Sequence, residues 1–311
     1  MDLQLTPRQT PQRTYRSFTL DSKLWDRYEP RPGDIVISTP AKVGTTWTQR
    51  IASVLVFQST ELPAPLLDIS PWLESPFVPI DVMLKTLEGQ EHRRFIKCHL
   101  PMDALPIYDE VSYIVVGRDL RDAAVSTHNQ MVGMNDSRHF QPPGLPSGDD
   151  VYLREHPEVP TDIREFWQKF FTESPFPWES NGWPYNSPTY HLESFWKHRD
   201  ESNIIFLHYQ DMLDDLDKEM RRVSAFLGIP VNEEIWPSLV EACTFSDMKA
   251  KKDKMFAGPM ATVLNKFEFF HKGTNGQWVD VLSERELAVY EAAMEPLPAD
   301  LRSWLARSAR A

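Results

Sequence analysis

Short apolar runs rich in β-branched residues recur along this chain, and amphipathic stretches separate them. Each run is apolar on both sides and short, as expected of a strand buried inside a parallel sheet. The clearest run reads VSYIVVGR and ends at Arg118. We predict four strands, at residues 34–39, 94–100, 111–118 and 203–209.

Apolar positions at helical spacing follow several of these runs. Trp47, Ile51, Val54 and Leu55 share one helix face. Asp119 precedes another such stretch as a candidate N-cap. Alternating strands and helices predict an α/β fold with a central parallel sheet flanked by helices. We predict helices at residues 45–58, 121–131, 162–171, 211–227 and 283–294.

Two segments fall outside this alternation. The length of 311 residues suits one large α/β domain or two small ones, and we assign residues 21–311 to a single domain. Residues 1–20 are expected to form an N-terminal arm or a strand that packs late. Residues 133–190 are rich in Pro, Gly, Ser and Trp and too long for an ordinary connection. This excursion is either a surface loop or a lid that walls an acceptor pocket, and we favour the lid.

The composition, 41% hydrophobic and 25% charged, is that of a folded globular protein. No apolar run approaches the roughly 20 residues of a membrane helix, and the N-terminus lacks the apolar core of a signal peptide. We therefore expect a soluble cytoplasmic protein without a transmembrane segment. Cys98 and Cys243 are too few for a disulfide framework and too scattered for a zinc site.

The formal net charge of −12 limits the classes of ligand. A general nucleic-acid binder would carry a basic stripe, so we expect no nucleic-acid partner. A small anionic ligand is still allowed, because it needs only a few local cations and a helix N-terminus.

Residues 39–47, TPAKVGTTW, join the first predicted strand to its helix. Gly44 allows a tight turn and a close approach of backbone to ligand. Thr45 and Thr46 offer hydroxyls, and their amides lie in the first helical turn, where N–H groups have no helical partner. With the charge of Lys42, this loop predicts an anion site.

The Walker A pattern, G-x-x-x-x-G-K-[ST], does not fit this loop. Thr45 stands where the lysine should follow Gly44, and Thr39 stands where the first glycine should be. Lys42 instead precedes Gly44 by two residues. The loop is therefore a phosphate cradle whose cation points differently, or else a polar turn with a solvated lysine.

The second predicted strand ends in Lys97-Cys98-His99-Leu100-Pro101. In open α/β sheets the carboxyl ends of strands line the ligand crevice. Alternation places Lys97 and His99 on the same side of the strand. A cation beside an imidazole suits group transfer, with His99 taking a proton and Lys97 stabilising charge on the moving group.

Two further segments carry cations at comparable positions. Arg118 ends the third strand and suits bidentate phosphate contact, although it could instead pair with Asp119 or Asp122. Ser126 follows in the next helix. Residues 271–278, HKGTNGQW, form a glycine-containing basic loop.

Together the four segments resemble the sulfotransferases that use 3′-phosphoadenosine 5′-phosphosulfate (PAPS). That family carries Y-P-K-S-G-T-T-W, K-T-H-L-P, an R…S pair and R-K-G-x-x-G-D-W, and here these stand as TPAKVGTTW, KCHLP, VVGRDLRDAAVS and HKGTNGQW. The resemblance extends from about Pro32 to Trp278. The segments DAAVSTHNQ and WTQR are similar to the matching segments of bacterial members that sulfate lipids or glycolipids.

The resemblance implies roles at the reacting end of the site. Lys42 would face the oxygen that bridges phosphate and sulfuryl. Val43 to Thr46 would cradle the 5′-phosphate with a P-loop-like turn. Lys97 would contact the sulfuryl oxygens, and His99 would be the general base for the acceptor hydroxyl. PAPS would be the sulfuryl donor and adenosine 3′,5′-bisphosphate (PAP) the product, with no metal required.

It also implies roles at the nucleotide end. Arg118 and Ser126 would bind the 3′-phosphate, which distinguishes PAPS from ATP. Trp47 would stack on the adenine, and Tyr209 and Phe245 would contact it.

The 3′-phosphate loop departs from the family pattern. Lys272 and Gly273 match it, but His271 replaces an arginine, and a neutral imidazole would hold the phosphate less tightly. Gln277 replaces an acid, and Cys243 departs from the adenine-contacting segment. The dimerisation motif of animal members is absent after the tryptophan, so the oligomeric state stays open.

Two other classes compete with a sulfotransferase. A nucleotide kinase would need a lysine directly after the glycine and a magnesium-binding carboxylate, and neither forms a clear motif. A non-catalytic nucleotide- or lipid-binding protein would show damage at Lys42, Lys97 or His99, and all three are intact.

The acceptor is predicted only by class. Aromatic residues lie in stretches expected to wall its pocket, although several could be core. They favour an apolar small molecule or lipid that carries a hydroxyl, such as a phenol, sterol or glycolipid. These aromatic residues are Trp72, Phe77, Phe140, Trp167, Phe171 and Trp178.

Overall fold

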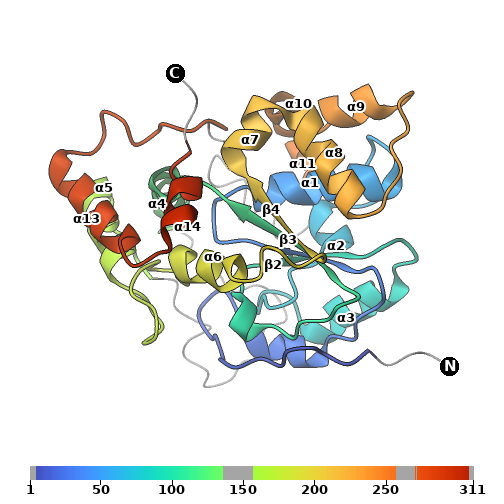
Figure 1. The fold of residues 1–311 in the computed structure, drawn as a ribbon, viewed down its shortest axis with the longest axis horizontal. Helices are drawn as coiled ribbons and strands as arrows, with labels where there is room; N and C mark the ends of the chain where they lie inside the picture. Colours follow the sequence, from blue (N-terminus) through green and yellow to red (C-terminus); the bar gives the residue numbers. More distant parts are fainter. Residues whose placement is uncertain (1–4, 136–156, 257–269, 271, 308–311) are drawn as a thin grey trace.

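The computed structural model describes residues 5–135, 157–256, 270 and 272–307. Its centre is a parallel four-stranded sheet in the order β2-β1-β3-β4 (Figure 1). The strands lie within the four predicted ranges, because their runs are apolar on both faces and buried. Their bounds are Ile35–Ser38 for β1, Phe95–Cys98 for β2, Ser112–Gly117 for β3 and Ile204–His208 for β4.

Helices surround the sheet. Helix α1 packs on β1 and β2, α8 on β4, and α6 on β3, and Figure 1 shows α1 and α8 on one side of the sheet and α6 on the other. The longer helices are α1 (Thr45–Phe57), α3 (Ile80–Gly89), α4 (Leu120–Met134), α5 (Ile163–Thr172), α6 (Pro188–Trp196), α8 (Leu216–Phe226) and α13 (Glu284–Met294). The shorter ones are η1 (Ser22–Arg27), α2 (Leu66–Ile69), η2 (Met102–Ala104), α7 (Tyr209–Asp214), α9 (Trp236–Glu241), α10 (Phe245–Ala250), α11 (Lys252–Met255) and α14 (Ala299–Leu305).

Side-chain caps determine where two predicted helices begin. Asp119 accepts a hydrogen bond from the backbone N–H of Arg121, which confirms it as the N-cap of α4. Ser283 and Glu286 form a reciprocal capping box at the start of α13.

The single helix expected over residues 211–227 is wrong. The chain forms α7 and α8 instead, and Asp215 separates them with φ −154°. The Asp215 carboxylate accepts from the N–H of Lys218, so this side chain ends one helix by capping the next. Gly228 then follows α8 with φ +63°, as expected of a residue just past a helix end.

The described part of the expected N-terminal arm, residues 5–20, packs against the domain. Tyr15 and Leu20 are buried, and Gln9 forms an isolated antiparallel bridge with Ile107. In the excursion at 133–190, α5 lies where a helix was predicted and packs against α4 and α13. Residues 136–156 of that excursion lie outside the described residues.

The sheet order places one edge of the molecule in position for ligand binding. β1 has β2 on one side and β3 on the other, so the connections leaving β1 and β3 diverge at their carboxyl ends. Such a switch point is where open α/β sheets bind ligands. None of the helices in the described part of the chain has the length and apolarity of a membrane crossing.

Candidate active site

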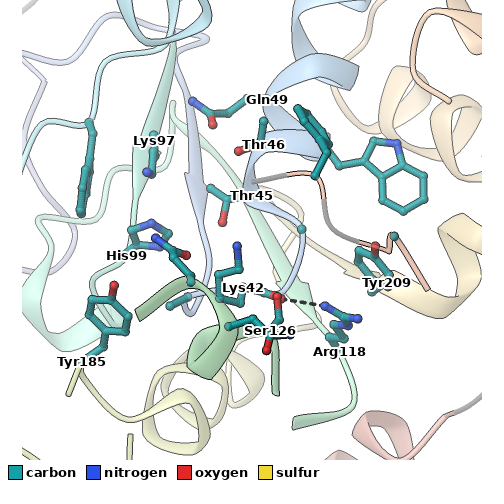
Figure 2. Close-up of a pocket in the computed structure, with 18 of the residues that line it drawn as sticks. Lys42, Thr45, Thr46, Gln49, Lys97, His99, Arg118, Ser126, Tyr185 and Tyr209 are labelled. Carbon is teal, nitrogen blue, oxygen red and sulfur yellow. Dashed lines mark hydrogen bonds between the residues drawn. The ribbon is translucent and has the colours of Figure 1, made fainter. Parts of the chain in front are cut away.

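A pocket opens at the carboxyl ends of β1, β2 and β3 (Figure 2). It brings together most of the residues predicted from the sequence. Val43 is an exception, because it is fully buried in the core and does not line the pocket. His271 lies outside the described residues. The predicted residues that line the pocket are Lys42, Gly44, Thr45, Thr46, Trp47, Lys97, His99, Arg118, Ser126, Tyr209, Phe245, Lys272 and Gly273.

The loop between β1 and α1 is held in an unusual backbone conformation. Lys42 has φ 63° and Gly44 has φ 116°. A Cβ on Gly44 would lie 3.0 Å from the Tyr209 ring, so both the backbone angle and the available space require glycine here. The Thr39 and Thr45 hydroxyls lie 2.6 Å apart and fix the base of the loop. Gly44, Thr45 and Thr46, at the start of α1, line the pocket, and an α-helix leaves the N–H groups of its first turn without a helical partner.

Two lysines enter the pocket from neighbouring strand ends. Figure 2 shows Lys42 and Lys97 pointing into the same space. Burial, followed by the nearby charges of Arg118 and Lys97, lowers the pKa of Lys42 to about 8. Burial also lowers the pKa of Lys97 to about 8, and the carboxylate of Glu74 acts against this. Two partly buried cations that repel each other favour a bound anion.

His99 has a defined tautomer. Its Nδ1 lies 2.7 Å from the carbonyl oxygen of Thr39. A carbonyl can only accept, so Nδ1 carries the proton and Nε2 has an available lone pair. Burial, followed by the charge of Lys97, holds the pKa of His99 well below its usual range. His99 is thus a neutral imidazole able to accept a proton.

Arg118 joins the two predicted phosphate loops. Its guanidinium donates to the carbonyl of Lys42 at 3.1 Å, the contact dashed in Figure 2, and to the carbonyl of Thr274 and the Asn275 side chain at 2.8 Å. The guanidinium carbon also lies 4.3 Å from the Tyr209 ring centroid. The alternative pairing of Arg118 with Asp119 or Asp122 is not observed among the described contacts.

Aspartates near Arg118 serve the surrounding structure instead. Asp119 pairs with Arg121. Asp122 accepts from the backbone N–H groups of Gly276 and Gln277 at 2.9 and 2.7 Å. The N-terminal turn of α4 therefore anchors the loop that carries Lys272.

Aromatic rings line the side of the pocket nearest Arg118. Trp47 and Tyr209 meet edge to face, with centroids 5.3 Å apart. The Trp47 indole N–H donates to the carbonyl of Cys243 at 2.8 Å. Phe245 packs against Phe270. These rings offer faces and edges to a flat heteroaromatic ligand.

The prediction that six aromatic residues wall the acceptor pocket is correct only in part. Trp72 and Phe77 line the pocket. Trp167 and Phe171 are buried core residues that pack on Tyr290. Their helical spacing in α5 was the signal that they belong to the core. Trp178 packs on Tyr15, and Phe140 lies outside the described residues.

Sequence reasoning missed several residues that line the pocket. Most lie outside the motifs, because separate loops and helix faces bring them together, although Ala41 belongs to the 39–47 loop. Asn186 is informative, since its side chain donates to the carbonyl of His99 at 2.9 Å and so helps to hold the strand end. The missed lining residues are Thr19, Leu20, Ala41, Gln49, Leu67, Asn129, Gln130, Met134, Tyr185, Asn186, Leu213, Met248, Phe256 and Phe270.

Comparisons with known proteins agree with this geometry. A model of the sulfotransferase domain matches residues 32–304. The chain therefore belongs to the sulfotransferase family and is an enzyme of that family. A glycolipid sulfotransferase of Mycobacterium tuberculosis (strain ATCC 25177 / H37Ra) is 34% identical over 309 residues, covering 93% of both chains. Sulfotransferase 1 family member D1 of Rattus norvegicus is 27% identical, covering 86% of this chain and 83% of its own.

Solved structures show the same fold. A mouse sulfotransferase complexed with PAP superposes with a TM-score of 0.65 at 21% identity, covering 93% of this chain and 94% of that one. Retinol dehydratase in complex with androsterone and PAP gives a TM-score of 0.62 at 20% identity, with coverages of 93% and 85%. The predicted fold class, a single α/β unit around a parallel sheet, is confirmed.

Proposed function

We propose that this enzyme moves a sulfuryl group from PAPS to a hydroxyl of a lipid-like acceptor, with His99 as the general base. One observation carries the proposal. A neutral His99 with its Nε2 unprotonated lines the same pocket as the ammonium groups of Lys42 and Lys97. A base beside two cations suits a reaction that takes a proton from a nucleophile and moves an anionic group.

The lining residues fit the parts of PAPS. The first-turn amides of α1, with Gly44, Thr45 and Thr46, suit the 5′-phosphate. Trp47, Tyr209 and Phe245 suit the adenine, in line with a family motif in which these positions contact the base. The 3′-phosphate fits beside two cations at the Arg118 side of the pocket, Arg118 and Lys272. The Ser126 hydroxyl and the Gly273 backbone lie in the same lining.

The proposed reaction is an in-line displacement at sulfur. When bound, PAPS supplies a sulfuryl group joined to a phosphate leaving group. His99 Nε2 takes the acceptor proton as the acceptor oxygen forms its bond to sulfur. The bond between sulfur and the bridging oxygen breaks, and that oxygen keeps the electron pair. Lys42 offsets the charge that grows there, and Lys97 offsets charge on the sulfuryl oxygens. Positioning and charge stabilisation supply most of the rate, as in phosphoryl transfer.

The side of the pocket with Trp72 and Phe77 is the proposed acceptor end. Its lining favours an amphiphilic acceptor whose hydroxyl lies near His99. Trp72, Phe77 and Leu20 give it apolar walls, while Gln130 and Asn186 add side-chain amides. Amide groups suit the hydroxyls of a sugar or glycerol head, and the apolar walls suit an acyl or sterol body. Similarity to a glycolipid sulfotransferase favours the same class. We propose that part of the excursion at 133–190 covers this end as a lid.

Two measurements test the proposal. The melting temperature should rise with PAP and not with ATP and Mg²⁺, because only PAP carries the 3′-phosphate that Arg118 suits. Purified enzyme given labelled PAPS should transfer label to glycolipids or sterols in a panel that also contains simple phenols. Stabilisation by ATP and Mg²⁺ alone would contradict the choice of donor, and transfer to phenols alone would contradict the acceptor class.

A further inference from the structure

Glu74 is a buried carboxylate directly behind the reacting groups. It lies in the loop between α2 and α3, and its side chain is 0% exposed. This loop runs beside β2, where Trp72 forms a parallel bridge with Lys97 and the Lys97 N–H donates to the carbonyl of Pro71 at 2.9 Å. Glu74 does not line the pocket. Glu74 can therefore affect a reaction in the pocket only through the residues that it contacts.

The Glu74 carboxylate accepts three N–H hydrogen bonds. Its Oε1 accepts from the Trp72 indole and from the backbone of His99, both at 2.6 Å. Its Oε2 accepts from the Trp25 indole at 2.9 Å. None of these N–H groups can act as an acceptor, so the site fits a carboxylate and not an amide. Burial raises the pKa of Glu74, and the three donors act against burial.

Two of the three donors belong to the reacting end of the site. The bond to the His99 backbone holds the residue whose ring faces the Thr39 carbonyl. The bond to Trp72 holds a ring whose centroid lies 4.0 Å from Lys97 Nζ and 5.2 Å from the His99 ring centroid, edge to face. One carboxylate thus orients the base directly and the sulfuryl-contacting lysine through a tryptophan.

We propose that Glu74 is a positioning residue for sulfuryl transfer, which fixes His99 and Trp72 by hydrogen bonds and supplies the counter-charge that keeps Lys97 an ammonium. The inference rests on the proposed function, because it assigns Glu74 a part in that reaction. At metal sites, losing a hydrogen-bond partner of a ligand costs about 10- to 100-fold, and we expect an effect of similar size at this site.

The charge part of the proposal depends on the groups that face Lys97. Among the described residues, Glu74 acts on Lys97 electrostatically from the α2–α3 loop. Lys42 interacts with it from the β1–α1 loop, Cys98 from the same strand, and His99 from just after that strand. His99 and Cys98 are neutral, since burial lowers the pKa of His99 and raises that of Cys98. Among the described residues, Glu74 is therefore the negative charge and Lys42 the positive charge that act on Lys97. Removing Glu74 should let Lys97 lose its proton at lower pH.

The test uses Glu74→Gln, with Glu74→Asp and Trp25→Phe beside it. We expect Glu74→Gln to lower kcat about 10- to 100-fold with an unchanged KM for PAPS. The alkaline limb of its kcat/KM profile should move to lower pH, because that limb reports groups of the free enzyme. Glu74→Asp keeps the charge but shortens the reach, so kcat should fall while the alkaline limb stays in place. Trp25→Phe removes the third donor only, so it should lower the melting temperature and leave kcat unchanged.

Two outcomes would overturn the proposal. Wild-type kcat in both Glu74 variants would exclude positioning, and an equal loss of kcat in Trp25→Phe would show a purely structural carboxylate. If Glu74→Gln does not fold, the kcat of Glu74→Asp decides. NMR titration of labelled lysine side chains, assigned with Lys97→Arg, needs no turnover. It separates failure of this inference, in which the Lys97 titration does not move in Glu74→Gln, from failure of the proposed function, in which the wild type transfers no sulfuryl group.

Discussion

Lys42, Lys97 and His99, the proposed reacting groups, share one environment that changes the charge of each in a different way. Burial lowers the pKa of Lys42 and Lys97 to about 8, which leaves both mainly charged at neutral pH. The same burial lowers the pKa of His99, which keeps it neutral and able to accept a proton. A pocket that destabilises positive charge therefore favours the neutral imidazole that the proposed base requires. The two lysines, in contrast, keep their charge best beside an anion, which in our proposal is the donor together with Glu74.

Replacing His99 by alanine tests the base at the residue scale. We expect His99→Ala to lower kcat about 10²- to 10⁴-fold, because the acceptor proton loses its acceptor. Affinity for PAP should stay near the wild-type value, since the phosphate cradle is intact. Transfer of labelled sulfuryl and calorimetric binding of PAP measure the two effects. His198→Ala is a matched control, because His198 pairs with Glu201 and does not line the pocket. Near wild-type turnover of His99→Ala would remove His99 from the reaction.

The lysines predict how nucleotide binding depends on pH. Their folded-state pKa values of about 8 mean that they lose protons as pH rises through 8. A bound phosphate favours the ammonium form, so PAP affinity should be highest below pH 8 and fall above it, with proton uptake on binding in that range. Calorimetry of PAP across pH 6.5 to 9.5, in buffers of different ionisation enthalpy, measures both. Affinity that is constant over this range would show that the backbone amides dominate binding.

The sequence predicted which residues line the pocket better than it predicted the residues that hold them in place. Alternation along one strand was enough to place Lys97 and His99 together. Glu74 gave no signal, because its partners come from η1, its own loop and a backbone N–H at the end of β2. Hydrogen bonds between distant segments leave no periodicity in the chain.

At the element scale, the proposed nucleotide end of the pocket is built from loops that hydrogen-bond to one another. The N-terminal turn of α4 binds the 272–277 loop through Asp122, and Arg118 ties that loop to the β1–α1 loop. Gly273 brings the loop against α10. Its φ is +67°, and a Cβ there would lie 2.4 Å from the Phe245 ring. The glycine therefore allows the loop and the aromatic side of the pocket to meet.

Alanine at Gly273 should separate these two elements. We expect Gly273→Ala to weaken PAP binding about tenfold or more, because it both strains a positive φ and displaces Phe245. Gly276→Ala is the matched control, since Gly276 has φ +79° and no atom within 4 Å of an added Cβ. Both variants carry the backbone strain, and only Gly273→Ala carries the clash. Calorimetry with PAP compares them, and equal losses would show that the contact with Phe245 does not matter.

Strands were easier to predict than short helices. The four strands carry continuous apolar runs, and the long helices α1 and α5 carry clear periodicity. One-turn helices such as α2 and α11 are too short for a period to show. The break between α7 and α8 occurs at Asp215, whose side chain caps α8. An aspartate can lie at a cap or inside a helix, and the sequence pattern alone does not distinguish the two.

At the scale of the whole molecule, the charge distribution is uneven. The chain carries a net charge of −12, yet the pocket gathers Lys42, Lys97, Arg118 and Lys272. An acidic exterior repels anions at long range, whereas the local cations attract them at contact. Because Lys42 and Lys97 are partly buried, salt screens their attraction for an anion less than it would screen that of an exposed basic patch.

Salt should therefore weaken PAP binding without abolishing it. Raising NaCl from about 50 mM to about 500 mM shortens the Debye length to well below the size of the domain, so the attraction of the pocket cations is partly screened. We expect PAP affinity to fall several-fold, and adenosine, which has the same aromatic contacts and no phosphate, to bind with nearly constant affinity. Calorimetry of both ligands across the series measures the difference. Equal salt dependence for the two ligands would contradict the assignment of the cationic side to the phosphates. A rise in PAP affinity with salt would show that the acidic exterior outweighs the pocket.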